Sequence, residues 1–276
     1  MNHEVNIKSI KLNNSNPIVL IAGPCVIESR EMILAVADSI KKVAVKYNIP
    51  FIFKSSYKKA NRTSLKGFQS IGMDESLKIL QEVQKQFEVP ILTDIHTEEE
   101  AKTVGPIVDV LQIPAFLCRQ TELLQAAGKF GKSVNIKKGQ FLSPKDISFA
   151  IEKVEATGNK NILCTERGSS FGYNNLVVDM RGLEIMKSTG YPVIIDASHS
   201  VQLPGGMNGE SGGESDYIFT IARSAIAVGV AGIFVETHPD PSKALSDAAC
   251  QLPLEKLPRL IEQVVKIDSL VKKEKW

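Results

Sequence analysis

Positive charge is concentrated in one short stretch of the chain, "FKSSYKKANRTS" at residues 53–64. It holds four cationic side chains with neutral hydrogen-bond donors between and after them: Lys54, Lys58, Lys59 and Arg62, with Asn61, Thr63 and Ser64. An arginine offers a planar fork that fits phosphate oxygens, and a lysine acts as a compact point charge. Because buried cations need anionic partners, a stretch that continues the apolar run "IPFIF" predicts an oxyanion ligand.

A second group of residues has the chemistry of a metal site: Cys25, His199, Glu236 and Asp247. A thiolate, an imidazole and carboxylates together suit a divalent transition metal such as Fe, Zn or Mn. Their spacing matches no compact metal motif, so the hypothesis depends on a fold that brings them together. A free cysteine is more often a small apolar core residue, the role that we assign to the other three cysteines of the chain.

The elements that must position these side chains are strands and helices in alternation. Short β-rich runs recur at residues 18–23, 51–55, 91–95, 110–114, 134–138, 162–166, 193–198 and 232–237. Near-continuous apolar runs are typical of strands buried on both faces of a parallel sheet. The segments between them, such as 29–47 and 74–87, have the apolar spacing of amphipathic helices. Eight strand–helix units predict an α/β protein, a (β/α)8 TIM barrel that spans residues 1–276 as one domain. Residues 3–17 are expected to form a hairpin that caps the barrel bottom.

A barrel of this kind carries its chemistry at the C-terminal ends of its strands. Each predicted strand ends in or is followed by polar residues: Cys25, Lys54, Ser56, Asp94, His96, Gln112, Lys137, Lys138, Glu166, Arg167, Asp196, His199, Glu236 and His238. We expect them to converge on one mouth, the active site. Five cations would then surround one cavity for one or two phosphates and a polyol or sugar: Lys54, Lys59, Arg62, Lys137 and Arg167. Lys58 alternates with this set, which leaves open whether it faces solvent. The glycine-rich residues 204–215 lack a GxGxxG or Walker pattern and are predicted to form a mobile lid.

The overall composition excludes several other classes of protein. Lys and Arg exceed Asp and Glu by only 33 to 31, for a net charge of +2, whereas a general nucleic-acid binder usually carries a larger basic excess. The four cysteines form no CxxC pair and no signal peptide is evident, which predicts a cytoplasmic protein with reduced thiols. No apolar stretch approaches the ~20 residues that span a bilayer. We expect no nucleic-acid partner and no membrane partner.

From about residue 5 to residue 270 the chain resembles the 3-deoxy-D-manno-octulosonate 8-phosphate synthases. The resemblance rests on "AGPCVIES", "FKSSYKKANRTS", "TDIH", "QIPAFLCRQT", "NIKKGQF", "TERGSSFGYNNLVVD", "DASHSVQLPGG" and "ETHPDPSKALSDA". The stretch "KANRTS" is the most specific, because the related 3-deoxy-D-arabino-heptulosonate 7-phosphate synthases typically have "KPRTS". The resemblance implies condensation of phosphoenolpyruvate with arabinose 5-phosphate and release of phosphate, in lipopolysaccharide synthesis.

The resemblance also implies roles for individual residues. Phosphoenolpyruvate would be bound by Lys54, Ser56, Lys59, Lys137 and Arg167, with Gln112 near it. Arabinose 5-phosphate would be held by Asn61, Arg62 and Thr63. Lys54, Lys59, Asn61, Lys137 and His199 are expected to be catalytic. Phe116 and Arg119 would reach the site from a neighbouring subunit of a homotetramer.

The family has a metal-dependent branch with Cys in its first loop and a metal-independent branch with Asn there. Cys25, together with "SDAACQ", resembles the metal-dependent branch and implies Cys25, His199, Glu236 and Asp247 as ligands. The implied mechanism is an aldol-like condensation in which C3 of phosphoenolpyruvate attacks the sugar aldehyde and water adds at C2. The cations would stabilise phosphate and carboxylate, and the metal would orient or activate the water.

Two other functions compete with this interpretation. A Schiff-base aldolase on the same barrel would use Lys54 or Lys137 as its nucleophile, because burial or a cationic neighbour can depress the pKa of a lysine. A phosphosugar-binding or sensing protein without catalysis is the second alternative. Such a protein would have little use for a thiolate-containing metal site at the mouth.

Overall fold

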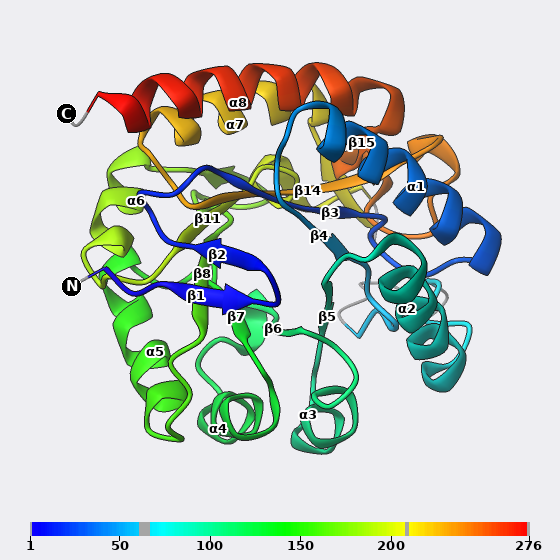
Figure 1. Cartoon of the computed structure of the whole chain (residues 1–276), viewed down its shortest axis with the longest axis horizontal. Coiled ribbons are helices and arrows are strands. Elements are labelled where there is room, and N and C mark those ends of the chain that lie inside the picture. Colours follow the sequence, from blue (N-terminus) through cyan, green and yellow to red (C-terminus); the bar gives the residue numbers. More distant parts are fainter. Residues whose placement is uncertain (1, 61–66, 208–209, 275–276) are drawn as a thin grey trace.

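The computed structural model describes residues 2–60, 67–207 and 210–274, and its centre is a closed barrel of parallel strands (Figure 1). The barrel strands in the described residues are β3 (Val19–Gly23), β4 (Phe51–Lys54), β5 (Ile91–Asp94), β6 (Val110–Ile113), β7 (Val134–Lys137), β8 (Ile162–Glu166), β11 (Val193–Asp196) and β14 (Gly232–His238). Each pairs in parallel with the next, and β14 closes the ring by pairing with both β11 and β3. The predicted (β/α)8 barrel is confirmed, and its strands match the predicted runs to within a residue or two.

Helices surround the barrel as an outer layer (Figure 1). They are α1 (Arg30–Lys46), α2 (Met73–Phe87), α3 (Glu98–Val104), α4 (Thr121–Phe130), α5 (Ile147–Glu155), α6 (Met180–Lys187), α7 (Ile218–Ala227) and α8 (Leu257–Lys273). Their apolar faces produce the packing: in α1, Ile33, Val36 and Ile40 recur at spacings of three and four and are buried. Local caps set where helices begin, as where the Thr97 hydroxyl accepts the Glu100 N–H at the start of α3.

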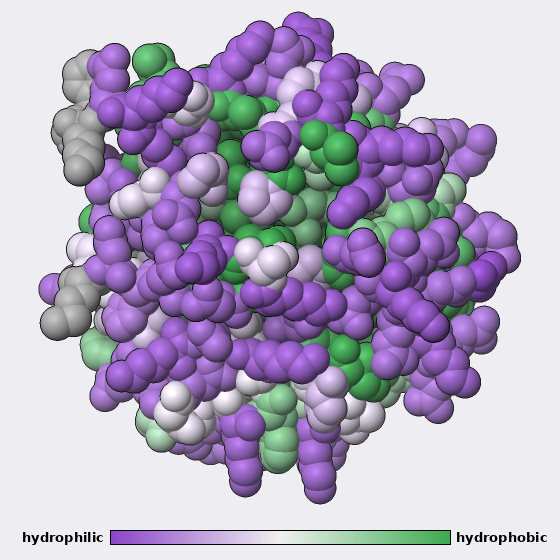
Figure 2. Space-filling view, viewed as in Figure 1, coloured by the Kyte–Doolittle hydropathy of each residue, from purple (hydrophilic) through white to green (hydrophobic). Residues whose placement is uncertain are grey.

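The N-terminal hairpin closes one end of the barrel, as the sequence predicts. Its strands β1 (Val5–Ile7) and β2 (Ile10–Leu12) lie across the barrel opening in Figure 1. Alternation places Val5 and Leu12 on the buried face, where they join an apolar cluster with the inward-facing side chains of the barrel strands. Figure 2 shows that this end of the molecule is mainly hydrophilic, with hydrophobic side chains gathered near the middle of the face. The packing of β1 and β2 on the barrel interior covers this end of the barrel.

Short strands outside the barrel shape its other end. They are β9 (Ser169–Ser170), β10 (Leu176–Val177), β12 (Gln202–Met207), β13 (Glu210–Gly213) and β15 (Leu252–Pro253). The stretch predicted as a lid contains most of the β12–β13 hairpin. The base of this hairpin packs closely on the turn Ala248–Cys250 that comes after β14, because a Cβ on Gly213 would come within 2.8 Å of the Ala249 carbonyl oxygen. Mobility of the hairpin stays a prediction.

None of the helices in the described ranges has both the length and the apolar character that crossing a membrane requires.

Candidate functional site

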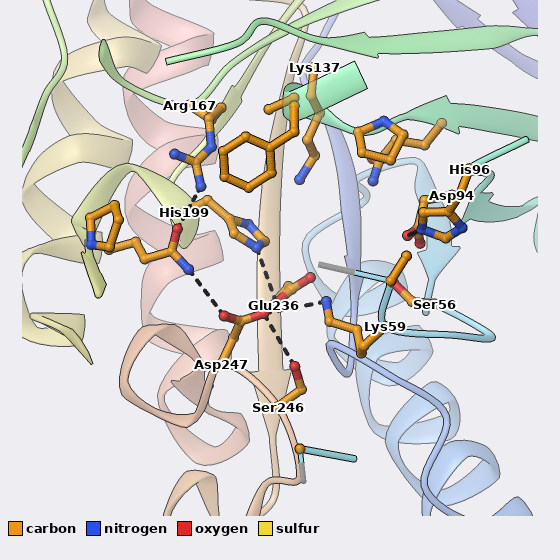
Figure 3. A pocket seen from close by; sticks show the side chains of 18 of the residues that line it. Ser56, Lys59, Asp94, His96, Lys137, Arg167, His199, Glu236, Ser246 and Asp247 are labelled. Atoms are coloured by element: carbon orange, nitrogen blue, oxygen red, sulfur yellow. Dashed lines mark hydrogen bonds and ion pairs between the residues drawn. The ribbon is translucent and has the colours of Figure 1, made fainter. Parts of the chain in front are cut away.

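A cavity of about 710 Å³ opens at the C-terminal ends of the barrel strands (Figure 3). Many of the predicted site residues line it: Lys54, Ser56, Lys59, Gln112, Phe116, Lys137, Arg167, His199, Glu236 and Asp247. They come from six different strand ends and the loops that follow them, as the barrel argument requires. Asn61, Arg62 and Thr63 lie outside the described residues. The structure therefore brings most of the predicted set to one mouth.

Two lysines lie at the bottom of this cavity beside the ring of Phe234. Lys54 Nζ is 2.7 Å from Glu236 Oε1, and Lys137 Nζ pairs with Asp196 and lies 3.6 Å from the Phe234 ring centroid. Burial, the largest single influence, lowers the pKa of Lys54, but the surrounding negative charges, Glu236 first and then Asp94, together outweigh it and the pKa is raised. Burial dominates at Lys137, whose pKa is lowered. Both lysines are buried, so an anionic ligand would meet them with little screening by water.

Arg167 has one guanidinium nitrogen without a hydrogen-bond partner in the part of the chain that the structure describes. Nη2 donates to Gln202 Oε1 at 2.8 Å, whereas Nη1 is buried and has no hydrogen-bond partner among the described residues. The backbone that carries this side chain is fixed by Glu166, whose Oε1 accepts the N–H groups of Arg167 and Gly168. Since an unmet donor on a buried cation is costly, Nη1 is a ready contact for an oxyanion.

Three predicted metal ligands come together beside the lysines. The ligand atoms of Cys25, Glu236 and Asp247 all lie within 4.8 Å of one another, and Cys25 Sγ is 3.1 Å from Asp247 Oδ2. His199, the fourth predicted ligand, follows β11 and places Nε2 3.7 Å from Glu236 Oε2. Figure 3 shows His199, Glu236 and Asp247 on one side of the cavity.

The donor set fits a divalent cation. Glu236 Oε2 is buried without a hydrogen-bond partner among the described residues. Burial, followed by the charge of Glu236, raises the pKa of the Cys25 thiol well above its ordinary value. A cation between these groups would give Glu236 Oε2 a partner and favour the thiolate. The structure therefore supports a possible carboxylate and cysteine metal site.

Across the cavity, Asp94 and His96, which the sequence placed among the polar strand ends, form a second polar cluster (Figure 3). His96 bridges Asp94 and Glu100, and Glu100 also pairs with Lys58 at 2.5 Å. The sequence left undecided whether Lys58 faces solvent, and the structure shows that it is partly buried and ion-paired with Glu100. Burial opposes the charge of His96, but the hydrogen bonds that its ring donates to Asp94 and Glu100 outweigh this effect and raise the pKa of His96 to about 9.

Several strand-end residues do not reach the mouth. Lys138 is fully buried and contacts Glu166 and the Gly139 carbonyl away from the cavity lining. His238 accepts the Asp240 N–H and lies 3.6 Å from Glu28. The expectation that every polar strand end faces the mouth is therefore wrong for Lys138, Glu166 and His238, which are absent from the lining. Cys25 and Asp196 are also absent from the lining, but each contacts a residue that belongs to it, Asp247 and Lys137 respectively.

Sequence reasoning also missed a bridging residue. Gln202 accepts from Arg167 through Oε1 and donates through Nε2 to Asp247 Oδ1 at 3.1 Å, so it links the oxyanion side to the metal side. Its signal in the sequence is its place within "DASHSVQLPGG", three residues after His199 and two before the glycine-rich stretch.

The fold and site define a class: a TIM-barrel enzyme whose mouth combines buried cations with a possible metal site. The chain belongs to the DAHP synthetase I family, whose model matches residues 2–273. It is 52% identical over 272 residues to a protein of Trichlorobacter lovleyi, covering 99% of this chain and 100% of that one. It is 51% identical over 271 residues to one of Brucella anthropi, and 50% identical over 271 residues to one of Brucella ovis, each time covering 98% of both chains. All three relatives are named 2-dehydro-3-deoxyphosphooctonate aldolase.

Proposed function

We propose that this enzyme condenses phosphoenolpyruvate with D-arabinose 5-phosphate to give 3-deoxy-D-manno-octulosonate 8-phosphate and phosphate, a step of lipopolysaccharide biosynthesis. The name shared by relatives that match nearly the full chain supports the reaction. The observation that carries the proposal is the gathering of Lys54, Lys59, Lys137 and Arg167 in one largely buried cavity. Two phosphorylated, anionic substrates need such a site.

Phosphoenolpyruvate is assigned to the buried cations. Arg167 Nη1, a buried donor with no partner among the described residues, is assigned to its phosphate, and Lys137 offers a charge with little solvent contact. Ser56 and Gln112 line the same cavity and add neutral hydrogen-bonding groups. The sugar phosphate is assigned to Asn61, Arg62 and Thr63, which follow Lys59 in the chain and lie outside the described residues.

In the reaction, C3 of phosphoenolpyruvate forms a bond with the aldehyde carbon of the sugar. Water adds at C2, and the bond between C2 and the oxygen that bridges to phosphorus then breaks, so that the bridging oxygen leaves with the phosphate. Lys54 and Lys137 stabilise the negative charge of the carboxylate and the departing phosphate. His199 is oriented by Asp196, which lies 2.9 Å from Nδ1 and accepts the His199 backbone N–H. Its other nitrogen faces Glu236.

We assign a divalent metal ion, Fe, Zn or Mn, to Cys25, His199, Glu236 and Asp247. When bound, the ion would supply a Lewis acid that orients or polarises the water. The assignment is supported by the proximity of three of these ligand groups and by the buried Glu236 Oε2, for which the described ranges hold no hydrogen-bond partner.

We further propose a cytoplasmic homotetramer in which Phe116 and Arg119 contribute to a neighbouring subunit's site. Both side chains are exposed in the single chain, Phe116 with 55% of its surface accessible at the rim of the cavity. An apolar ring of this size on the surface is suited to contact with a second subunit. Light scattering coupled to gel filtration measures the assembly, and a monomer at working concentration would contradict it.

A Schiff-base aldolase is the second candidate, favoured by one observation: burial lowers the pKa of Lys137, which makes the amine a better nucleophile. Borohydride reduction in the presence of the carbonyl substrate distinguishes the two mechanisms. A covalent adduct at Lys54 or Lys137 would favour the Schiff base, whereas the proposed condensation predicts none.

The position of bond cleavage tests the proposed reaction. In ¹⁸O-labelled water, attack at C2 followed by C–O cleavage predicts released phosphate without label, with a product mass equal to both substrates plus water minus phosphoric acid. Labelled phosphate would show cleavage at phosphorus instead. No phosphate release with both substrates present would favour a binding or sensing protein.

A further inference from the structure

A chain of charged side chains runs from the cavity wall to helix α3. It consists of Asp94 at the end of β5, His96, Glu100 in the first turn of α3, and Lys58. His96 Nε2 lies 3.1 Å from Asp94 Oδ2, and His96 Nδ1 lies 3.0 Å from Glu100 Oε2. Glu100 Oε1 contacts Lys58. Asp94 and His96 line the cavity, whereas Glu100 and Lys58 do not.

The arrangement requires a doubly protonated imidazole. A neutral histidine has one N–H, so one ring nitrogen would turn a lone pair toward a carboxylate. Only the imidazolium donates to Asp94 and Glu100 at once. Glu100 is itself held as an anion, because Oε2 also accepts the His96 backbone N–H at 2.6 Å. The contact with Lys58 adds a positive charge on its other side.

The charged surroundings of the imidazole agree with this state. The pKa of His96 is raised to about 9 although burial opposes the charge, and the pKa of Asp94 is lowered by His96 against the same effect of burial. From the β4 loop, the Tyr57 ring meets the edge of His96 at a centroid distance of 6.2 Å. The cations Lys54 and Lys59 act on Asp94 from the cavity side.

One oxygen of Asp94 remains available for a ligand. Asp94 Oδ2 is taken by His96, whereas Oδ1 is buried without a hydrogen-bond partner among the described residues. A buried carboxylate oxygen with no donor is costly unless a bound molecule supplies one. A hydroxyl group or a water in the cavity would do so.

We propose that Glu100 is a positioning residue that keeps His96 protonated and thereby holds the Asp94 carboxylate with Oδ1 as an acceptor for the bound substrates. The inference rests on the proposed function, since those substrates are the ligands meant. Glu100 touches neither substrate in this account. It acts through His96.

Histidine NMR measures the protonation state of His96 directly. The His96 resonance, assigned by its loss in His96→Gln, should stay in the protonated position up to about pH 8 and titrate near pH 9. In Glu100→Gln the amide oxygen can still accept from Nδ1, but the negative charge is gone. The midpoint should then fall by about one unit or more. Glu99→Gln is the matched control, because it removes the same charge from the same helical turn at an exposed position, and it should leave the midpoint unchanged.

Activity gives a second readout. The pH profile of kcat/KM in Glu100→Gln should gain an ionisation at the midpoint that NMR reports for that variant, whereas Glu99→Gln keeps the wild-type profile. A wild-type His96 that titrates below pH 7 would overturn the inference, and this result does not require Glu100→Gln to fold. An unchanged midpoint in folded Glu100→Gln would also overturn it. Absence of any turnover with the proposed substrates would instead contradict the proposed function and leave the NMR result standing.

Discussion

Arg167→Lys removes half of a guanidinium fork while keeping its charge. In the structure Nη2 is committed to Gln202 and Nη1 is the buried donor without a described partner. The single amine of a lysine can contact either Gln202 or the ligand position of Nη1, but not both with the geometry of the guanidinium. If Nη1 binds the phosphate of phosphoenolpyruvate, the variant loses one charge-assisted hydrogen bond, worth about 1.5–3 kcal/mol. The kcat/KM for phosphoenolpyruvate should then fall by roughly 10- to 150-fold.

Phosphate release with phosphoenolpyruvate varied and arabinose 5-phosphate saturating measures this loss. Arg181→Lys is the matched control, because Arg181 also makes a fork, to Asp179, but on the exposed surface. It should leave kcat/KM unchanged. A folded Arg167→Lys enzyme whose kcat/KM for phosphoenolpyruvate stays within about twofold of wild type would refute the assignment of Nη1 to this substrate.

Four further predictions follow from the same structure. Chelation by EDTA should abolish turnover, and added Mn, Fe or Zn should restore it. Cys25→Ser should weaken metal binding measured by elemental analysis, and Cys25→Asn introduces the residue that the metal-independent branch carries at this position. Full activity of metal-free wild type would contradict the ligand assignment. Arg62→Ala should raise the KM for arabinose 5-phosphate far more than that for phosphoenolpyruvate, and equal losses for both would count against the sugar assignment. The pKa of His96 is higher in the folded protein than the unfolded value near 6.5, so the stabilisation from protonated His96 is fully present below about pH 6.5 and is lost as the pH rises through about 9. Urea unfolding should show a larger loss of stability in His96→Gln, relative to wild type, at pH 6 than at pH 9.5. An equal loss at the two pH values would refute this prediction. Leu12→Ala, in the buried hairpin face, should cost about 2–5 kcal/mol of unfolding free energy with little change in KM, and a selective rise in one KM would show that the hairpin reaches the site.

The barrel could be predicted because its signal is local. A parallel strand covered on both faces must be apolar along its length, so β3 and β11 are visible as runs in the sequence. The polar residues after them mark the active face without any knowledge of long-range contacts. The β12–β13 hairpin could not be predicted in the same way, because glycine carries no alternating pattern.

The site was predictable in its members and less so in its pairings. Lys137 and Lys138 are neighbours with the same charge, yet alternation along the strand turns one toward Phe234 and the other away from the cavity. Lys58 meets Glu100 across 42 positions of the chain, a contact that no local pattern encodes. Gln202 likewise owes its role to two partners that only the folded barrel brings near it.

The choice of aldose tests the central claim most directly, because the family match alone does not distinguish an arabinose 5-phosphate enzyme from one that uses erythrose 4-phosphate. Phosphate release from phosphoenolpyruvate should be measured with each sugar in turn, with the metal supplied, and compared as kcat/KM. The account predicts a clear preference for arabinose 5-phosphate, since "KANRTS" differs from the heptulosonate pattern at the sugar-binding stretch. A preference for erythrose 4-phosphate would contradict it.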